Sequence, residues 1–535
     1  MNFPVKKILL CCLSAAVLRG VPALAQNLDQ IGVTLLRAVT TNVDGRGVRV
    51  AQPEAIETSG TTNFEVNPAA VGQPVGLFTY ISIDGTANSF PNALGGASGH
   101  AAGVAGNFYG LSGGVATNVA HVDNYDADDL VQVSGPFVTP FSTNYTAALP
   151  AGNINDAVVN QSYTFGTVPT SEQQAIDTAY DNYAAQYNTL FVSAANNGGP
   201  VSPPGTSYNC ISVGAYGGSS SYGPTLDNGR CKPDLTAPAG MTSFSTPQVS
   251  GAAALLIQAA LRGDGGGDTN SASDLRTIKA LLLNGAVKPA DWTNENSSPL
   301  DARYGAGVVN VLNSYEQLAG GKNSGIVSTM VATGGAHPPT GATGTVGVLS
   351  GWDFSTNTSS AASDAIRHYY FNVTNNSGGA KFTATATLVW NRHRYKTGIN
   401  NLNLFLYNCA NSNLVACSTS LVDNVEHIFV PQLAPGRYDL QIWKAGGTTV
   451  TTNEACALAF EFFSDTLAVA KAGTNTVLSW PAYPAGFRVE AATSLVAPVW
   501  STNNLPPSVI TNSRNSLMLN ATNAEQFFRL RRPNF

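Results

Sequence analysis

Charged side chains are scarce in this sequence. Lys, Arg, Asp and Glu make up 11% of its 535 residues, and no basic cluster follows the N-terminal segment. Nucleic-acid binding needs a positively charged face, so this composition excludes it as the main role. After residue 25 no stretch is long and apolar enough to cross a membrane, so a soluble protein without a membrane span is expected.

Cysteine is also sparse. Of the seven cysteines, Cys11 and Cys12 lie in the N-terminal segment. The other five are Cys210, Cys231, Cys409, Cys417 and Cys456. Their spacings do not match a zinc site. In an oxidising compartment we expect disulfide bonds between Cys210 and Cys231 and between Cys409 and Cys417, with one cysteine left over.

The chain opens like an export signal. Lys6 and Lys7 precede an apolar run at 8–18, and Ala23–Ala25 fits the small-residue cleavage pattern. Removal of this segment, which also contains Arg19, changes the formal net charge from −6 to −9. Abundant Gly, Ser, Thr and Asn agree with export, so we expect a secreted protein, extracellular or periplasmic.

The most informative segment runs from Ser243 to Gly251 and leads into an Ala- and Leu-rich stretch. This pattern predicts a loop that becomes a buried helix, with the Ser243 hydroxyl at the helix N-terminus. Unpaired backbone N–H groups and the positive helix end would face an anion there. Taken alone, Ser243 is better explained as a helix N-cap.

Three other polar side chains stand at the ends of predicted elements. His100 lies in Ser98–Gly106, where a loop meets a helix of very small residues. Asn197 lies at the carboxyl end of the apolar strand that begins at Leu190, and Glu54 ends a short strand at 47–54. Reacting groups collect at the carboxyl edges of parallel strands, so these side chains are candidates for one site.

Together these segments resemble the subtilisin-like serine proteases (subtilases). Val50–Glu54 matches the family's aspartate strand, and His100–Gly106 matches its histidine segment without gaps. Ala194–Gly199 and Met241–Gly251 match its asparagine turn and its serine segment. Supporting matches in family order occur at 211–215, 232–238, 277–286 and 304–310, so the resemblance covers roughly residues 45 to 315.

The resemblance implies an α/β fold with a parallel sheet flanked by helices. It also implies a secreted serine endopeptidase that hydrolyses protein or peptide substrates through a Ser243 acyl-enzyme. His100 would be the general base and then acid, Glu54 the carboxylate of a Glu-His-Ser triad, and Asn197 a donor to the oxyanion. The strand at 157–163 resembles the family's substrate strand, so we expect Ser162, Tyr163 and Thr164 to line the peptide cleft.

The departures from the family pattern keep alternatives open. Glu54 stands where the family has Asp, and Asp84, Asp123 or Glu57 are the other carboxylates that could contact His100. Met241 replaces a glycine, and residues 101–103 replace Gly-Thr-His after the histidine. The rival hypotheses are therefore a catalytically impaired subtilase fold that binds peptides or surfaces, and a protein whose work lies in carbohydrate or surface binding by its C-terminal part.

The C-terminal part is predicted to be all-β. After a Gly-, Thr- and Pro-rich linker at 320–346, strands that alternate in polarity indicate a sandwich, which resembles the jelly-roll domain that follows some subtilase domains. The expected division is a signal at 1–25, a protease domain at 26–319, a β-sandwich at 347–465 and a small β module at 466–535. No cofactor or metal is expected, although Asp423 and Glu426 leave calcium as an alternative. We expect the protein to act as a monomer.

Overall fold

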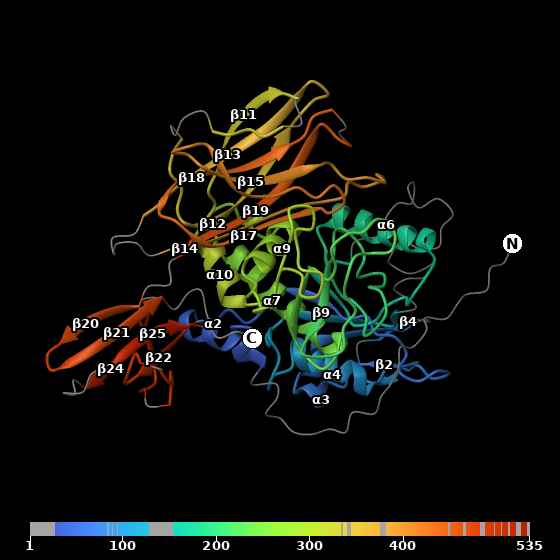
Figure 1. The fold of residues 1–535 in the computed structure, drawn as a ribbon. Helices are drawn as coiled ribbons and strands as arrows, with labels where there is room; N and C mark the ends of the chain where they lie inside the picture. Colours follow the sequence, from blue (N-terminus) through green and yellow to red (C-terminus); the bar gives the residue numbers. More distant parts are fainter. Residues whose placement is uncertain are drawn as a thin grey trace.

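The computed structural model describes residues 27–531, except for 83–84, 88, 94, 128–153, 333–334, 340–343, 375–380, 448–449, 464–466, 482–486, 497, 504, 512–513 and 521–525. An α/β part, a β-sandwich and a small β module follow one another along the chain (Figure 1). This order confirms the expected fold class. The export signal expected at 1–25 lies outside the described residues.

An eight-stranded sheet forms the centre of the α/β part. Its order is β10-β9-β8-β7-β1-β6-β3-β4, and all neighbours are parallel except β3 and β4 at one edge. The strands are β1 (Arg49–Ala51), β3 (Phe78–Ser82), β4 (Gly85–Ala87), β6 (His121–Tyr125), β7 (Val158–Gln161), β8 (Leu190–Ala194), β9 (Ile211–Tyr216) and β10 (Leu235–Pro238). Because the strands are parallel, their carboxyl ends meet at one edge of the sheet.

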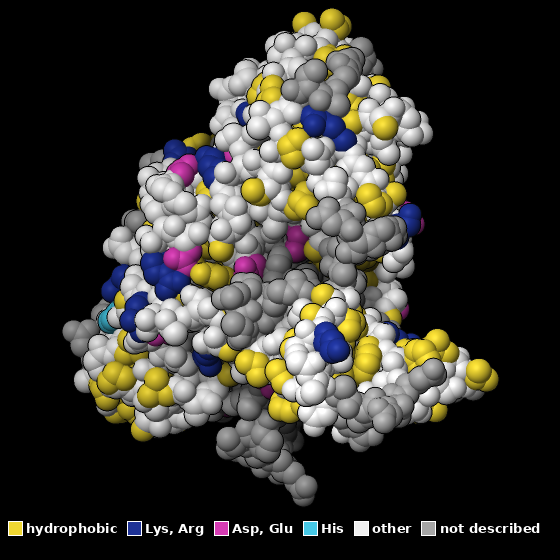
Figure 2. All heavy atoms as spheres, turned by 90° about the vertical axis from the view of Figure 1, so that its left-hand side faces the viewer, with side chains coloured by type: hydrophobic (Ala, Val, Ile, Leu, Met, Phe, Trp, Pro, Cys, Tyr) yellow, Lys and Arg dark blue, Asp and Glu magenta, His cyan; other side chains and the backbone are white. Residues whose placement is uncertain are grey.

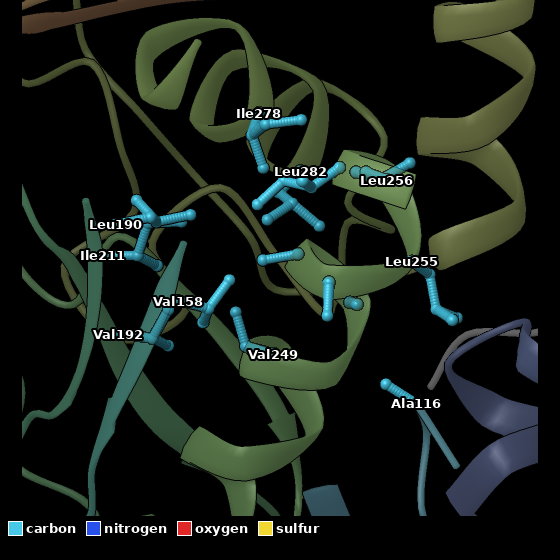
Figure 3. Packing of buried hydrophobic residues seen from close by; sticks show 14 of the residues in the cluster. Ala116, Val158, Leu190, Val192, Ile211, Val249, Leu255, Leu256, Ile278 and Leu282 are labelled. Carbon is cyan, nitrogen blue, oxygen red and sulfur yellow. The ribbon is translucent and has the colours of Figure 1, made fainter. Parts of the chain in front are cut away.

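Helices cover the sheet, as expected for parallel strands whose faces are both buried. The helices are α2 (Val33–Val39), α3 (Pro68–Val71), η1 (Val75–Leu77), α4 (Gly99–Phe108), α6 (Thr170–Tyr187), α7 (Thr242–Arg262), α8 (Thr269–Ala272), α9 (Leu275–Asn284) and α10 (Val311–Ala319). A minor parallel pair, β2 (Asn63–Glu65) and β5 (Gly96–Ala97), lies before α4. Figure 3 shows Val249 of α7 near Val158 and Val192 of the sheet, and Leu256 of α7 near Leu282 of α9, so α7 lies between the sheet and α9.

The β-sandwich consists of two antiparallel sheets. One has the order β11-β13-β18-β15-β16 and the other β12-β19-β14-β17. The strands are β11 (Ile326–Val331), β12 (Ser350–Thr358), β13 (Ser363–Val373), β14 (Phe382–Trp390), β15 (Leu402–Asn408), β16 (Asn413–Ser418), β17 (Val425–Leu433), β18 (Gly436–Lys444) and β19 (Asn453–Phe463). The segment 320–346 was expected to be a linker, but it contributes the edge strand β11.

The small module contains two further antiparallel sheets, β20-β21-β24-β23 and β22-β25. The strands are β20 (Ala468–Ala472), β21 (Asn475–Pro481), β22 (Arg488–Ala492), β23 (Val509–Thr511), β24 (Arg514–Asn520) and β25 (Phe527–Arg531). A separate small core holds them together around Leu478, Trp480, Val489 and Leu517. The module therefore buries its own apolar side chains.

The sandwich and the α/β part share one hydrophobic core. Trp352 and Val389 of the sandwich belong to the same buried cluster as α9 and α10. The Trp352 indole donates to the backbone oxygen of Leu318 at 3.2 Å, and Asn284 of α9 accepts from Thr385 and Thr387. The sheet that contains β12 and β14 is thus buried on both faces, by the other sheet and by helices.

The expected disulfide bonds are not formed. All five cysteines in the described part of the chain are free. The Cys210 thiol points to the backbone oxygen of Ser207 at 3.1 Å. Cys417 pairs with Phe405 in the ladder, whereas Cys409 follows the end of β15, so the two are not cross-strand neighbours. The prediction assumed that Cys409 and Cys417 face each other across a hairpin because they are close in sequence. The observed strand register does not place them opposite each other.

Candidate active site

Ser243 lies at the start of α7, directly beyond the carboxyl edge of the sheet. Strand β10 ends at Pro238, and Met241 has extended backbone angles before the helix begins. Ser243 is the second helical residue, and 7% of its surface is exposed. Its hydroxyl therefore sits at the positive end of a 21-residue helix.

A proline inside α7 allows the start of the helix to form a hydrogen bond with the residue after β7. Pro247 has no N–H, so the backbone oxygen of Ser243, four residues earlier, lacks its usual helical partner. The Ser162 hydroxyl donates to that oxygen at 2.9 Å. In return, the Ser243 hydroxyl donates to the backbone oxygen of Ser162 at 3.5 Å, a long contact.

Asn197 is fixed against the first residue of α7. Its side-chain oxygen accepts from both the backbone N–H and the hydroxyl of Thr242, each at 2.8 Å. The preceding Asn196 has a φ of 99°, a backbone shape that asparagine tolerates better than most residues, and its side chain accepts the Asn197 N–H. The Asn197 amide NH₂ and the Ser243 N–H have no hydrogen-bond acceptor among the described residues.

His100 and Glu54 are in direct contact. His100 is the second residue of α4, which is capped by the Ser98 hydroxyl at 3.0 Å. Glu54 follows β1 and stays in the sheet edge, because its N–H donates to the backbone oxygen of Tyr125 at 2.9 Å. The His100 Nδ1 and Glu54 Oε2 atoms are 2.8 Å apart. The carboxylate is buried while the imidazole remains 31% exposed, as a proton-transfer group requires.

Gln52, which the sequence prediction did not include, holds the second oxygen of Glu54 and is itself held by Tyr109. The Gln52 amide donates to Glu54 Oε1 at 2.8 Å and to the backbone oxygen of Ala101 at 3.0 Å. The Tyr109 hydroxyl in turn donates to the Gln52 side-chain oxygen at 2.5 Å. Gln52 lies two residues before Glu54, and that spacing puts both side chains on one face of an extended segment, a signal that the sequence contained.

The pKa of His100 lies above its ordinary value. Burial acts to lower the pKa of His100, but the charge and hydrogen bond of Glu54 and the charge of Glu57 together outweigh burial. Glu57 is not the ring's partner, because its carboxylate accepts the Gly99 N–H at 2.7 Å. Asp123 pairs with Arg49 instead, at 2.8 Å. Asp84, the remaining alternative, lies outside the described residues.

The N-termini of α4 and α7 pack closely through Phe244. The His100 and Phe244 rings have centroids 5.9 Å apart. A Cβ on Gly103 would lie 2.8 Å from the Phe244 ring, so only glycine fits at that place in α4. The helices thereby bring His100 and Ser243 to one place, but in this conformation no hydrogen bond among the described residues joins the Ser243 hydroxyl to the imidazole.

The three residues expected to line a peptide cleft follow β7 and are largely buried. Ser162 contacts the Ser243 backbone as described above. The Tyr163 hydroxyl accepts from Gln161 at 2.9 Å, and the Thr164 hydroxyl accepts the Gly166 N–H at 3.3 Å. Each side chain is less than a tenth exposed, so a peptide at this place would meet mainly backbone groups.

The two carboxylates considered for calcium both have protein partners. Asp423 accepts from the Cys231 N–H and from the Ser420 hydroxyl, each at 2.7 Å, and Glu426 accepts from Ser418. Within the described residues no group of three or more His, Cys, Asp or Glu could hold a metal ion. In the same part of the chain, no helix has the length and hydropathy needed to cross a membrane.

Residues 85–307 match the model of the Subtilase family. The matched region contains His100, Asn197 and Ser243 and leaves Glu54 outside. No curated protein matches the chain.

Among solved structures, a serine protease of Aeromonas sobria is 14% identical, with 88% of this chain and 92% of that chain covered and a TM-score of 0.38. The same protease in complex with its chaperone ORF2 is 14% identical, with 79% and 89% covered and a TM-score of 0.33. Tripeptidyl peptidase 2 is 13% identical, with 74% and 47% covered and a TM-score of 0.29. These likenesses are too distant to carry an argument about function.

Proposed function

We propose that the chain, whose residues 85–307 match the Subtilase family model, is a secreted serine endopeptidase that cleaves proteins through an acyl-enzyme on Ser243. The observation that supports this most is the 2.8 Å contact between Glu54 and His100 at the N-terminus of α4, packed against the start of α7 that carries Ser243. A neutral imidazole held by a buried carboxylate is the base that a serine hydroxyl needs.

The proposed first step is attack of Ser243 Oγ on the scissile carbonyl carbon. The hydroxyl proton moves to His100 Nε2, and the buried Glu54 carboxylate stabilises the imidazolium through Nδ1. Glutamate replaces the family's aspartate here, and its extra methylene is accommodated because Gln52 holds the other carboxylate oxygen. The leaving amine then takes the proton from His100, and water releases the acyl group by the reverse sequence.

The Asn197 NH₂ and the Ser243 N–H are the proposed donors to the oxyanion. Thr242 occupies the Asn197 side-chain oxygen, and this contact leaves the amide NH₂ to face the reacting centre. Losing one such donor raises the barrier by roughly 3 to 4 kcal/mol in a well-studied subtilase.

The Ser243 side chain must rotate before reaction. Its hydroxyl makes a 3.5 Å contact with Ser162, which is weak enough for rotation about χ1 to replace it. Catalytic hydrogen bonds are often long without substrate and tighten when substrate binds. We propose that binding of an extended peptide to the backbone at 162–164 causes the Ser243 side chain to rotate.

Export and a monomeric state complete the proposal. The N-terminal segment supports export. Lys and Arg side chains do not gather in one patch on the face drawn in Figure 2, which agrees with a protein substrate rather than nucleic acid. The division into domains at 26–319, 347–465 and 466–535 is likewise proposed.

The proposal is tested by hydrolysis of a denatured protein substrate with the purified mature chain. Ser243→Ala and His100→Ala should each lower kcat/KM by several orders of magnitude with an unchanged circular dichroism spectrum. Glu54→Gln should lower it by about 10⁴-fold, since the amide cannot stabilise the imidazolium. Asp123→Asn is the matched control and should have little effect. A folded wild-type chain that binds peptide without cleaving it would instead support the impaired, peptide-binding hypothesis.

A further inference from the structure

A second Ser-His-Asp arrangement lies in the β-sandwich, remote in sequence from the site above. It crosses three neighbouring strands, β11, β13 and β18 (Figure 1). The Ser328 hydroxyl is 2.9 Å from His368 Nε2, and His368 Nδ1 is 2.8 Å from Asp439 Oδ2. In a catalytic triad one imidazole nitrogen contacts the serine hydroxyl and the other contacts the carboxylate, as they do here. Such a triad is recognised by geometry rather than by position in the sequence.

Strand register produces this arrangement. His368 pairs directly with Ile326 of β11 and with Gln441 of β18. Ser328 and Asp439 are each two residues from those partners, so all three polar side chains share one face of the sheet and lie diagonally across it.

A glutamine binds this carboxylate too, but through the oxygen that also contacts the histidine. Asp439 is fully buried, and the Gln441 amide donates to its Oδ2 at 2.7 Å. In both sites a glutamine two residues away in the chain binds the carboxylate that contacts Nδ1 of the histidine. A buried carboxylate is unfavourable without partners. Here His368 and Gln441 both bind Oδ2, while Oδ1 has no hydrogen-bond partner among the described residues.

The Ser328 and His368 side chains are partly exposed to solvent. Ser328 is half-buried on an edge strand, and the His368 side chain is 14% exposed. Ile326 and Met330, which flank Ser328 on the same face, are 48% and 44% exposed. An apolar acyl or aryl group could therefore lie along β11 with its carbonyl next to the Ser328 hydroxyl.

We propose that Ser328 is a second activated nucleophile, which accepts acyl groups from activated apolar esters such as aryl esters. Ser328 Oγ forms a bond to the carbonyl carbon while its proton moves to His368 Nε2. The bond to the aryl oxygen breaks, the phenol leaves with the proton from His368, and water hydrolyses the acyl-serine. Activated esters are the proposed class because their leaving group departs easily. Amide cleavage would also need donors for the oxyanion.

A fluorophosphonate probe tests this in the full-length mature Ser243→Ala chain, followed by peptide mapping. The probe reacts with activated serines, with fluoride as the leaving group. We expect an adduct on Ser328. Labelling should be at least about 100-fold slower in Ser243→Ala/His368→Asn, the usual contribution of a general base. Asp439→Asn in the same background should slow it as well, and circular dichroism verifies the fold of each variant.

The neighbouring Thr329 is the matched control, since it lies on the opposite face of the same exposed strand. Thr329→Ala should not change the rate, and Ser328→Ala should abolish the adduct. No adduct on Ser328 in folded Ser243→Ala, or one that forms equally fast in the folded His368→Asn variant, overturns the proposal. Because the two serines lie in different peptides, this outcome is read separately from labelling of Ser243 in the wild type.

Discussion

Gln52 is the side chain that holds Glu54 in the orientation that the proposed triad requires. Its amide bridges Glu54 Oε1 and the Ala101 backbone, and Tyr109 fixes its orientation. Without it, the longer glutamate side chain would have one free carboxylate oxygen and more rotamers. Gln52 is therefore a positioning residue, which acts on the reaction only through Glu54.

We predict that Gln52→Ala lowers kcat with little change in KM. The expected loss of kcat is on the order of 10- to 100-fold. Losses of this size follow the removal of a residue that hydrogen-bonds to a metal ligand in a metalloenzyme. Glu54→Asp, as a single substitution, should also lower kcat, because the shorter side chain cannot reach both Gln52 and His100. Steady-state kinetics with a peptide substrate measures both, and Gln174→Ala, at an exposed position of α6, serves as a control glutamine. Full activity of Gln52→Ala would contradict the positioning role.

Glu57 gives a second prediction, on pH. Its negative charge contributes to the raised pKa of His100, and the base must be neutral to act, so activity should rise with pH through a midpoint above the ordinary value for histidine, about 6.5. Glu57→Gln removes that charge and should move the acid limb of kcat/KM to lower pH. Glu295→Gln removes the same charge from an exposed position and should leave the limb unchanged. A limb that does not move in Glu57→Gln would rule out this influence.

Packing between α4 and α7 sets the distance between the two reactive groups. Gly103 leaves room for the ring of Phe244, the residue after Ser243. We predict that Gly103→Ala destabilises the fold by about 1 to 3 kcal/mol, because its methyl group would push against the Phe244 ring. Activity should fall as well, since the same ring lies beside His100.

The matched control lies one turn further along the same helix. A Cβ on Gly106 would meet nothing within 4 Å, so Gly106→Ala should be neutral or stabilising by about 0.5 to 1 kcal/mol. Phe244→Leu should restore part of the loss in Gly103→Ala. Urea denaturation of Gly103→Ala, Gly106→Ala, Phe244→Leu and Gly103→Ala/Phe244→Leu measures the coupling between Gly103 and Phe244. Equal effects of the two glycine substitutions would contradict it.

Sequence patterns predicted the elements that carry the site better than the contacts between them. Local signals place Ser243, His100 and Asn197 at element ends, because helix starts and parallel strands leave clear marks in small and apolar residues. The interaction of Gln52 with Tyr109 depends on a helix that follows much later in the chain. Strand β11 was missed because 320–346 is rich in Gly, Thr and Pro, and its pairing with β13 is a tertiary effect. The disulfide prediction was wrong for the same reason, since strand register is not local.

The shared core joins the sandwich to the α/β part more firmly than a linker would. Arg392 is buried at this junction, where its guanidinium contacts Asp181 at 2.8 Å and Thr178 at 2.9 Å. Its backbone N–H and oxygen both bind the Asn209 side chain. Asp181 belongs to α6, whose helix packs against the strand that leads to Asn197.

We predict that Arg392→Met destabilises the whole chain by about 3 to 5 kcal/mol, because Asp181 would remain buried without its cation. One cooperative thermal transition should move to lower temperature for both parts. Arg392→Met/Asp181→Leu should recover part of the loss, while Arg394→Met, at a half-buried neighbour, should have little effect. If only the sandwich melted earlier, the two parts would be independent, contrary to the shared core.

The most direct test of the account is the site of covalent modification in the wild-type mature chain. Treatment with a sulfonyl fluoride or fluorophosphonate, followed by peptide mapping, should give an adduct on Ser243 that forms in step with loss of proteolysis. Labelling of Ser243 should be lost in folded His100→Ala and strongly slowed in folded Glu54→Gln. A correctly folded wild-type protein whose Ser243 stays unmodified, while proteolysis continues or is absent, would contradict the assignment of Ser243 as a nucleophile activated by His100 and Glu54.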